Sequence, residues 1–195
     1  MIERLGAGSL EEAARTLRRE GMPQDEALFF SVLADGIIDR ARAYAEPSSR
    51  EFRAAALSLL ERAVFLASPF ADAAELITVS GAETERGAEA EDGQKIKSGK
   101  KRKRGDAALA VSLLTIWMSI FRDALARQLS AADIKNSDQA ALVDRVASRF
   151  TTARIQGIID IIAKAQRNLA GGASVYLTLD GVLADLFIKE NKETP

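Results

Sequence analysis

Residues 106–129 read DAALAVSLLTIWMSIFRDALARQL, and this stretch decides the fold class of the chain. Its large apolar residues recur every three or four positions, which is the spacing of an amphipathic helix. Asp106 is placed to cap that helix. The longest run without a charged residue, 107–121, is fifteen residues long, whereas a membrane span needs about 20 apolar residues. We therefore expect a buried core helix and no membrane segment.

Three further helices are predicted downstream of this stretch. The polar residues 130–138 form a turn region, after which apolar residues follow at helical spacing in 142–150 and again in 155–169. The glycines at 171–172 interrupt the pattern. A last amphipathic helix is then predicted over residues 175–187.

Upstream of the central stretch, the sequence also has a helical pattern. Serine followed three residues later by glutamate is a capping box, and it predicts helix starts at Ser9 and Ser48. Between them, apolar residues at helical spacing predict one continuous helix over about 24–44. Pro69, at a first helical position, restarts a helix that reaches about Ile77. Because no segment alternates in the manner of a strand, we predict an all-α protein of about seven helices in a bundle-like array.

A charged segment separates the two helical regions. Residues 81–105 contain five glycines, with five acids in the first half and seven bases in the second half, and almost no large apolar residue. Such a composition cannot bury enough apolar surface to offset the entropy lost on ordering, so we expect one long disordered insert. The predicted organisation is a helical segment 1–80, a disordered acidic-then-basic linker 81–105, a C-terminal helical part 106–190 and a tail 191–195.

The chain of 195 residues contains no cysteine and no histidine. Disulfides, cysteine-based zinc and iron–sulfur sites, Ser-His-Asp triads and imidazole bases are therefore excluded. Asp35 and Asp39 are four residues apart and would share one face of the predicted helix 24–44. We interpret them as solvated surface charge rather than as a metal or acid–base pair. We expect the chain to be no enzyme by itself and to use no cofactor and no metal.

A run of five consecutive bases closes the linker, and it has three interpretations. It could contact a phosphate backbone without sequence preference, act as a nuclear-localisation signal in a eukaryote, or be the solvated end of a linker. No aromatic residue is interleaved, so the run lacks a stacking platform for bases. The five candidate nucleic-acid contacts are Lys100, Lys101, Arg102, Lys103 and Arg104.

The second half of the chain carries an ordered series of short motifs. They are the basic run leading to Gly105-Asp106, Trp117 with Phe121-Arg122-Asp123, the turn Asn136-Ser137-Asp138, Ala165-Gln-Arg-Asn168, and Leu177-Thr-Leu-Asp180-Gly-Val-Leu183. In this order they resemble the C-terminal (collar) region of the delta-prime subunit of bacterial DNA polymerase III, a clamp-loader subunit, in its high-GC Gram-positive form. Gly8-Ser-Leu-Glu-Glu-Ala-Ala14 is similar to the segment that joins the ATPase lid to that region.

The resemblance also has departures. The aromatic residue before Arg-Asp is usually Tyr in that family but is Phe121 here, and residues 171–174 replace an Asn-rich turn. The ATPase portion of the family carries a phosphate loop, a Ser-Arg-Cys motif and a four-Cys zinc module, and this sequence contains none of them.

The resemblance implies an oligomerisation domain in DNA replication. Its partners would be the other clamp-loader subunits, gamma/tau and delta, with DNA contacted only indirectly or weakly, no membrane, and a cytoplasmic location. The candidate residues for a partner interface or for packing are Trp117, Phe121, Arg122 and Asp123. We favour an intramolecular core position for Trp117 and Phe121, and a role in helix packing for Arg122 and Asp123.

Overall fold

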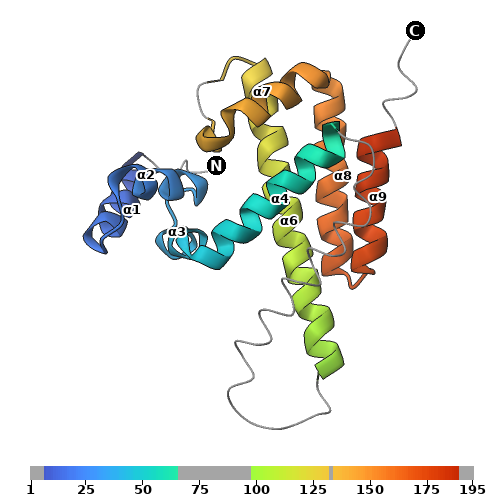
Figure 1. Cartoon of the computed structure of the whole chain (residues 1–195), viewed down its shortest axis with the longest axis horizontal. Coiled ribbons are helices and arrows are strands. Elements are labelled where there is room, and N and C mark those ends of the chain that lie inside the picture. The colour runs from blue at the N-terminus through green and yellow to red at the C-terminus, as the bar shows by residue number, and fades with distance from the viewer. Residues whose placement is uncertain (1–6, 66–97, 132–133, 189–195) are drawn as a thin grey trace, which may run out of the picture.

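The computed structural model describes residues 7–65, 98–131 and 134–188. Within these residues the chain forms eight α-helices and one 3-10 helix, with no strand (Figure 1). The predicted all-α class is confirmed. The elements are α1 (Ala7–Arg19), α2 (Gln24–Leu33), α3 (Ile38–Ala45), α4 (Pro47–Phe65), α6 (Ser98–Gln128), η1 (Ser137–Gln139), α7 (Ala140–Arg149), α8 (Thr152–Ala170) and α9 (Val175–Ile188).

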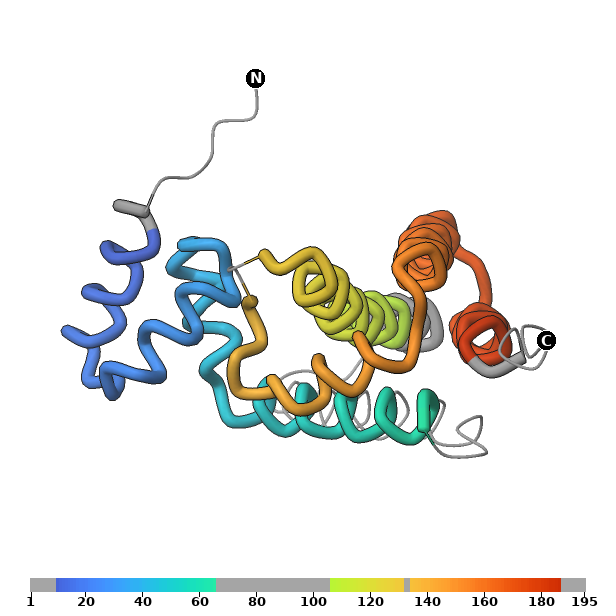
Figure 2. Tube along the Cα trace, turned by 90° about the horizontal axis from the view of Figure 1, so that it is seen from above, coloured from blue at the N-terminus to red at the C-terminus, as the bar shows by residue number. Residues whose placement is uncertain are grey.

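Helix α6 is the centre of a C-terminal bundle, a name we use for α4 and α6–α9. Seen along its axis in Figure 2, α6 has α8 and α9 on one side and α4 and α7 on another. Leu113, Trp117, Ile120 and Phe121 of α6 are fully buried and join one hydrophobic core with residues of the four surrounding helices. The apolar stretch that predicted the fold is therefore the core of the bundle.

Residues Asp106–Gln128 form the one described helix that is long and apolar enough to cross a membrane. The apolar character of this helix has a simpler source, because its largest side chains are buried among the other helices of the bundle. This arrangement is typical of a core helix and agrees with the sequence-based expectation.

Helix α6 begins earlier than predicted, at Ser98 rather than at Asp106. The last residues of the predicted disordered insert, 98–105, therefore form the first turns of this helix, where lysine and arginine are good helix formers. The remainder of the insert, 81–97, and the predicted helix from Pro69 to Ile77 lie outside the described residues.

The first three helices form a separate N-terminal unit (α1–α3) with its own small core. Leu17, Phe30 and the alanines at positions 27, 34 and 41 are buried together there. The predicted continuous helix 24–44 is wrong, because the chain turns between α2 and α3. At this turn the backbone is left-handed at Asp35 (φ 55°) and Gly36 (φ 78°), conformations that Asp tolerates and Gly adopts without cost.

Both predicted capping boxes also fail as helix starts. Ser9 lies inside α1, which begins at Ala7, and Ser48 lies inside α4, which begins at Pro47. Proline suits a first helical position because its fixed φ matches the helix and the amide N–H that it lacks would have no partner there. A side-chain cap does occur at α8, where Thr151 accepts a hydrogen bond from the backbone N–H of Arg154.

Candidate partner interface

Two of the predicted interface candidates lie inside the bundle. Trp117 and Phe121 are fully buried. The indole Nε1 of Trp117 donates to the carbonyl of Ala56 in α4 at 2.8 Å, and the ring of Phe121 packs against Phe150 with centroids 6.1 Å apart. Both side chains therefore hold α6 against its neighbours, and neither is accessible to a partner of the folded chain.

Asp123, one turn beyond Ser119 on α6, is buried and binds the turn that precedes α7. Its carboxylate accepts hydrogen bonds from the backbone N–H of Asn136 at 2.7 Å, from the side-chain amide of Asn136 at 2.8 Å and from the backbone N–H of Lys135 at 3.3 Å. A buried carboxylate is tolerated when several N–H groups replace its hydration. Asp123 is thus a structural anchor.

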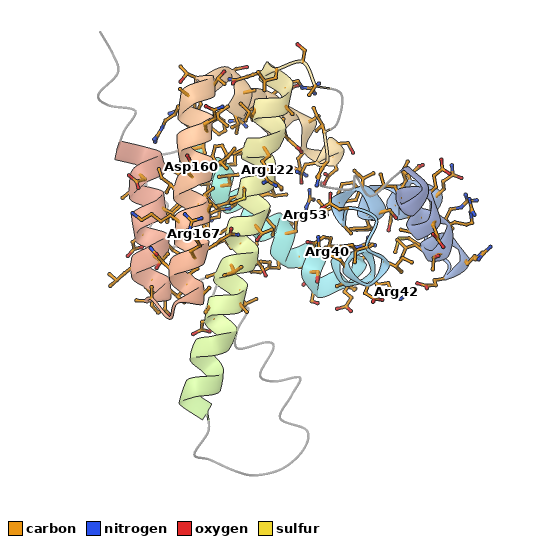
Figure 3. All side chains as sticks on the ribbon, turned by 180° about the vertical axis from the view of Figure 1, so that it is seen from behind. Arg40, Arg42, Arg53, Arg122, Asp160 and Arg167 are labelled. Carbon is orange, nitrogen blue, oxygen red and sulfur yellow. The ribbon has the colours of Figure 1, made fainter. Side chains whose placement is uncertain are left out.

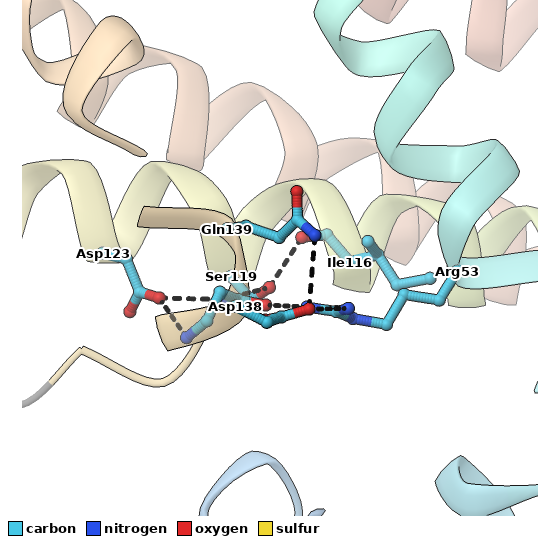
Figure 4. Close-up of polar contacts among 7 residues, drawn as sticks. Arg53, Ile116, Ser119, Asp123, Asp138 and Gln139 are labelled. Atoms are coloured by element: carbon cyan, nitrogen blue, oxygen red, sulfur yellow. Dashed lines mark hydrogen bonds and ion pairs between the residues drawn. The ribbon is translucent and has the colours of Figure 1, made fainter. Parts of the chain in front are cut away.

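Asn136 extends this anchor into a network between three elements (Figure 4). It is fully buried, donates to the hydroxyl of Ser119 at 3.1 Å, and accepts from the guanidinium of Arg53 in α4 at 2.8 Å. The same guanidinium binds both carboxylate oxygens of Asp138, at 2.7 and 3.1 Å. The turn is therefore fixed to α6 and α4 at once.

The turn Asn136-Ser137-Asp138 is one of the motifs that carry the family resemblance, but no sequence pattern indicates which side chains it binds. Arg53 lies 83 residues before Asn136 in the chain. No spacing rule connects the two, because the contact depends on how α4 packs against α6. In the sequence, Arg53 stands beside the apolar residues of α4 that pack against the core, and this position is the signal that could have marked it.

Arg122 differs from its neighbour Asp123. It is exposed and forms no hydrogen bond or ion pair with the described residues. Its side chain lines a groove of about 1020 Å³ that runs between α6 and the helices α3 and α4. Of the four candidate interface residues, Arg122 is thus the accessible cation.

The walls of this groove, which we call the α4/α6 groove, come from both parts of the molecule. Leu33, Arg40 and Tyr44 of the N-terminal unit face α4 and α6 across it. The α6 wall includes a stripe at helical spacing, formed by Leu109, Ser112, Ile116, Ser119, Asp123 and Ala126.

Ion pairs join the N-terminal unit to the bundle beside the groove. The ammonium group of Lys135 pairs with the carboxylate of Asp35, and Oδ2 of the same carboxylate lies 3.8 Å from Nη1 of Arg40. Nη2 of Arg50 in α4 pairs with Oε2 of Glu26 in α2 at 2.7 Å. Asp35 is thus held at the junction, in the turn after α2, whereas Asp39 lies in α3, so the two do not share a helix face.

A second ion-pair group lies within the N-terminal unit. The guanidinium of Arg42 in α3 binds the carboxylate of Glu20 and, at 2.9 Å, that of Asp39. The hydrogen bond from Arg42 lowers the pKa of Glu20 below its ordinary value, and the same contact raises the pKa of Arg42. This group fastens α3 to the end of α1 and takes no part in the groove.

The basic run lies apart from these residues. Lys100, Lys101, Arg102, Lys103 and Arg104 fall in the first turns of α6, which project beyond the rest of the bundle in Figure 1. The structure therefore does not bring this run together with Arg122 or Asp123. Their side chains lie outside the described part of the chain.

Chemically, the groove offers contacts rather than a reacting group. No three His, Cys, Asp or Glu side chains within the described ranges are placed to hold a metal ion. The groove combines partly buried apolar side chains, small hydroxyl residues and accessible guanidinium groups. Such a surface is suited to binding another polypeptide.

Comparison with known proteins gives one match. Residues 104–179, from the early turns of α6 to the first turns of α9, match the family model described as "DNA polymerase III, delta subunit, C terminal". No curated protein and no solved structure matches the chain. The matched residues hold most of the bundle and none of the N-terminal unit. This part of the chain is therefore similar to the C-terminal region of a clamp-loader subunit of DNA polymerase III.

Proposed function

We propose that the chain is the collar domain of a clamp-loader subunit of the delta-prime type, and that it assembles with gamma/tau and delta subunits into the ring that loads the sliding clamp. The observation that carries this proposal is the family match over residues 104–179. The match is to the delta subunit, and the delta-prime assignment rests on the motif order of the sequence. The chain acts in the cytoplasm, in DNA replication, by binding and without chemistry of its own.

The surface of the bundle supports an assembly role. Leu129, at the end of α6, and Tyr176 and Leu177 of α9 are 65%, 45% and 76% exposed. Exposed apolar and aromatic residues are the groups that subunit interfaces bury. The eight bases and five acids of residues 83–104 leave a net charge of −4 for the rest of the chain, a sign that disfavours DNA binding.

Co-purification tests the assembly role. The full chain is co-expressed with the gamma/tau and delta subunits of its own organism, and the complexes are measured by size-exclusion chromatography with light scattering. We expect one stable complex containing all three proteins. A chain that remains monomeric beside folded partners would contradict the proposal.

Competition distinguishes the two subunit types. Purified delta-prime in excess should displace the chain from such a complex, because both would occupy the same position in the ring. Delta in excess should leave the chain bound. The reverse pattern would assign the chain to the delta position.

A second candidate function is non-specific nucleic-acid binding by the basic run. It is favoured by the position of residues 100–104 on the projecting turns of α6. DNA affinity, measured by fluorescence anisotropy over a range of salt concentrations, is compared for the full chain and for a deletion of residues 95–104. Loss of a salt-dependent affinity would favour this function, and an unchanged affinity would remove it.

A further inference from the structure

We propose that the α4/α6 groove is the docking site for an amphipathic helix of a partner protein, one that presents an apolar face and carboxylates. The inference goes beyond the proposed function, because it concerns a surface of the isolated chain and does not depend on which proteins form the ring. It rests on the shape of the groove, its apolar lining and its unbalanced charge.

The shape of the groove matches an elongated ligand. Its α6 wall runs from Leu109 to Ala126, and at 1.5 Å per residue this stripe is about 26 Å long. Ser112, Ser119 and Ala126 recur along the stripe and are small enough for a second helix to approach α6 closely. A helix of about 17 residues spans the same length.

The placement of the polar groups favours a peptide over a metabolite. Pockets for small molecules occupy roughly 300–1,000 Å³ and place a few polar groups around one point. This groove, at about 1020 Å³, is of similar size, but its polar side chains are spread along its length on α3, α4 and α6. A helix laid in a groove uses such a surface through anchors at i, i+3, i+4 and i+7.

The lining supplies apolar contacts for one face of that helix. Phe52 of α4 and Leu109, Ile116 and Met118 of α6 line the groove, and each is only partly buried although it packs against the core of the bundle. Their remaining exposed surface faces the groove. Covering it would remove apolar area from water, which favours association.

The charges of the groove specify the polar face of the partner. The groove is lined by three carboxylates. Asp123 is already bound by three N–H groups and Asp35 by Lys135, so the exposed Glu51 is the carboxylate that remains accessible. Among its bases, Arg122 is unpaired within the described residues, and Arg40 has one contact, 3.8 Å from the already paired Asp35.

Accessible positive charge therefore exceeds accessible negative charge in the groove. Figure 3 shows Arg40, Arg53 and Arg122, which come from α3, α4 and α6, in a row across the molecule seen from behind. Arg53 is satisfied by Asp138, so Arg122 and Arg40 are the groups that remain to bind carboxylates of a partner.

A designed peptide tests the proposal on the full chain. The probe is a fluorescein-labelled amphipathic helix of about 18 residues, with leucines at i, i+3, i+4 and i+7 and glutamates beside the leucine stripe. Fluorescence anisotropy gives the affinity, and amide shift changes in 1H–15N spectra locate the site. We expect saturable binding with the shift changes on α4, α6 and α3.

Two matched arginine variants test the charge argument. Arg122 and Arg167 are both exposed helical arginines without a described partner, but Arg167 lies on α8, outside the groove (Figure 3). We expect R122E to weaken binding of the glutamate peptide about threefold to tenfold and R167E to leave it unchanged. A peptide with lysine in place of glutamate should regain affinity for R122E.

A third variant tests the shape argument. S112W places a large side chain in the groove at an exposed position, so the fold should be preserved, which circular dichroism verifies. We expect it to abolish binding of both peptides. Absence of saturable binding to the native chain at about 1 mM peptide, shift changes confined to other helices, or equal losses in R122E and R167E would each overturn the proposal.

Discussion

The C-terminal bundle and the N-terminal unit are both helical, but they are stabilised differently. The bundle buries Trp117, Phe121 and many Leu and Ile side chains in one core. The N-terminal unit buries one leucine, one phenylalanine and three alanines at its centre, and surface ion pairs fasten its helices to each other and to α4. Since exposed ion pairs contribute little, we expect the unit to depend on its contact with the bundle, and the bundle to retain its fold when the unit is destabilised.

The largest difference is expected from truncation in the bundle core. Trp117→Ala removes a fully buried indole and its hydrogen bond to Ala56, which should lower the free energy of unfolding by about 3–5 kcal/mol. Urea unfolding followed by circular dichroism measures this loss. Phe30→Ala is the matched change in the N-terminal unit.

The response of Trp117 sharpens this test. It is the single tryptophan of the chain, so its fluorescence reports on the bundle alone. For Phe30→Ala we expect the far-ultraviolet signal of α1–α3 to be lost early, with the Trp117 fluorescence transition almost unmoved. Equal shifts of both signals would mean that the two parts unfold as one unit.

The second effect concerns the network between the turn and the bundle. Asn136→Ala removes one of the three N–H donors to the buried Asp123 and one acceptor of Arg53, so we expect a loss of about 1–3 kcal/mol. The backbone N–H groups of residues 135 and 136 can still donate to Asp123, and Asp138 still binds Arg53, which limits the loss. Ser137→Ala, at the exposed neighbour, should change stability by less than about 0.5 kcal/mol in the same urea titration.

A pair of glycine substitutions should act in opposite directions in the two regions. A Cβ at Gly21 or at Gly157 would meet no atom within 4 Å, but Gly21 has φ +95° whereas Gly157 lies inside α8. Gly21→Ala should therefore destabilise the N-terminal unit by about 1 kcal/mol. Gly157→Ala should stabilise the bundle by about 0.5–1 kcal/mol. Thermal unfolding of both variants measures the two signs, and a common sign would contradict the comparison.

The smallest effect is a pH dependence confined to the N-terminal unit. The pKa of Glu20 is lowered in the folded chain by Arg42, so this pair stabilises the unit above the ordinary glutamate pKa of 4.5 and ceases to do so as the pH falls through the lowered value. The protection factors of amides in α1 and α3, which correct for the pH dependence of intrinsic exchange, should fall below that pH. Glu20→Gln should remove this change, and an identical fall in the variant would assign it to other groups.

The sequence predicted the bundle well, because its apolar positions recur with helical spacing over long stretches. The sequence patterns were less reliable for the positions at which individual helices begin and end. The capping boxes at Ser9 and Ser48 lie inside helices, and the 24–44 pattern continued through the break at Gly36, because the apolar residues on both sides of the break face the same small core. The start of α6 at Ser98 was missed because a basic run that suits disorder by composition also has high helix propensity.

The candidate site was predicted in part. Trp117 and Phe121 are core residues, as their position on the apolar stripe indicated, and Asp123 fixes packing. The α4/α6 groove and the role of Arg53 depend on residues far apart in the chain. Helical periodicity places side chains on a face of one helix, but it does not say which helices meet.

Hydrogen exchange tests the central claim most directly. The amides of the chain are followed alone and in a mixture with the gamma/tau and delta subunits of its organism, under conditions in which those subunits assemble. The assembly role of the bundle predicts new protection within residues 104–179, with α1–α3 exchanging as in the free chain. Protection absent from the bundle, or present in α1–α3 alone, would contradict it.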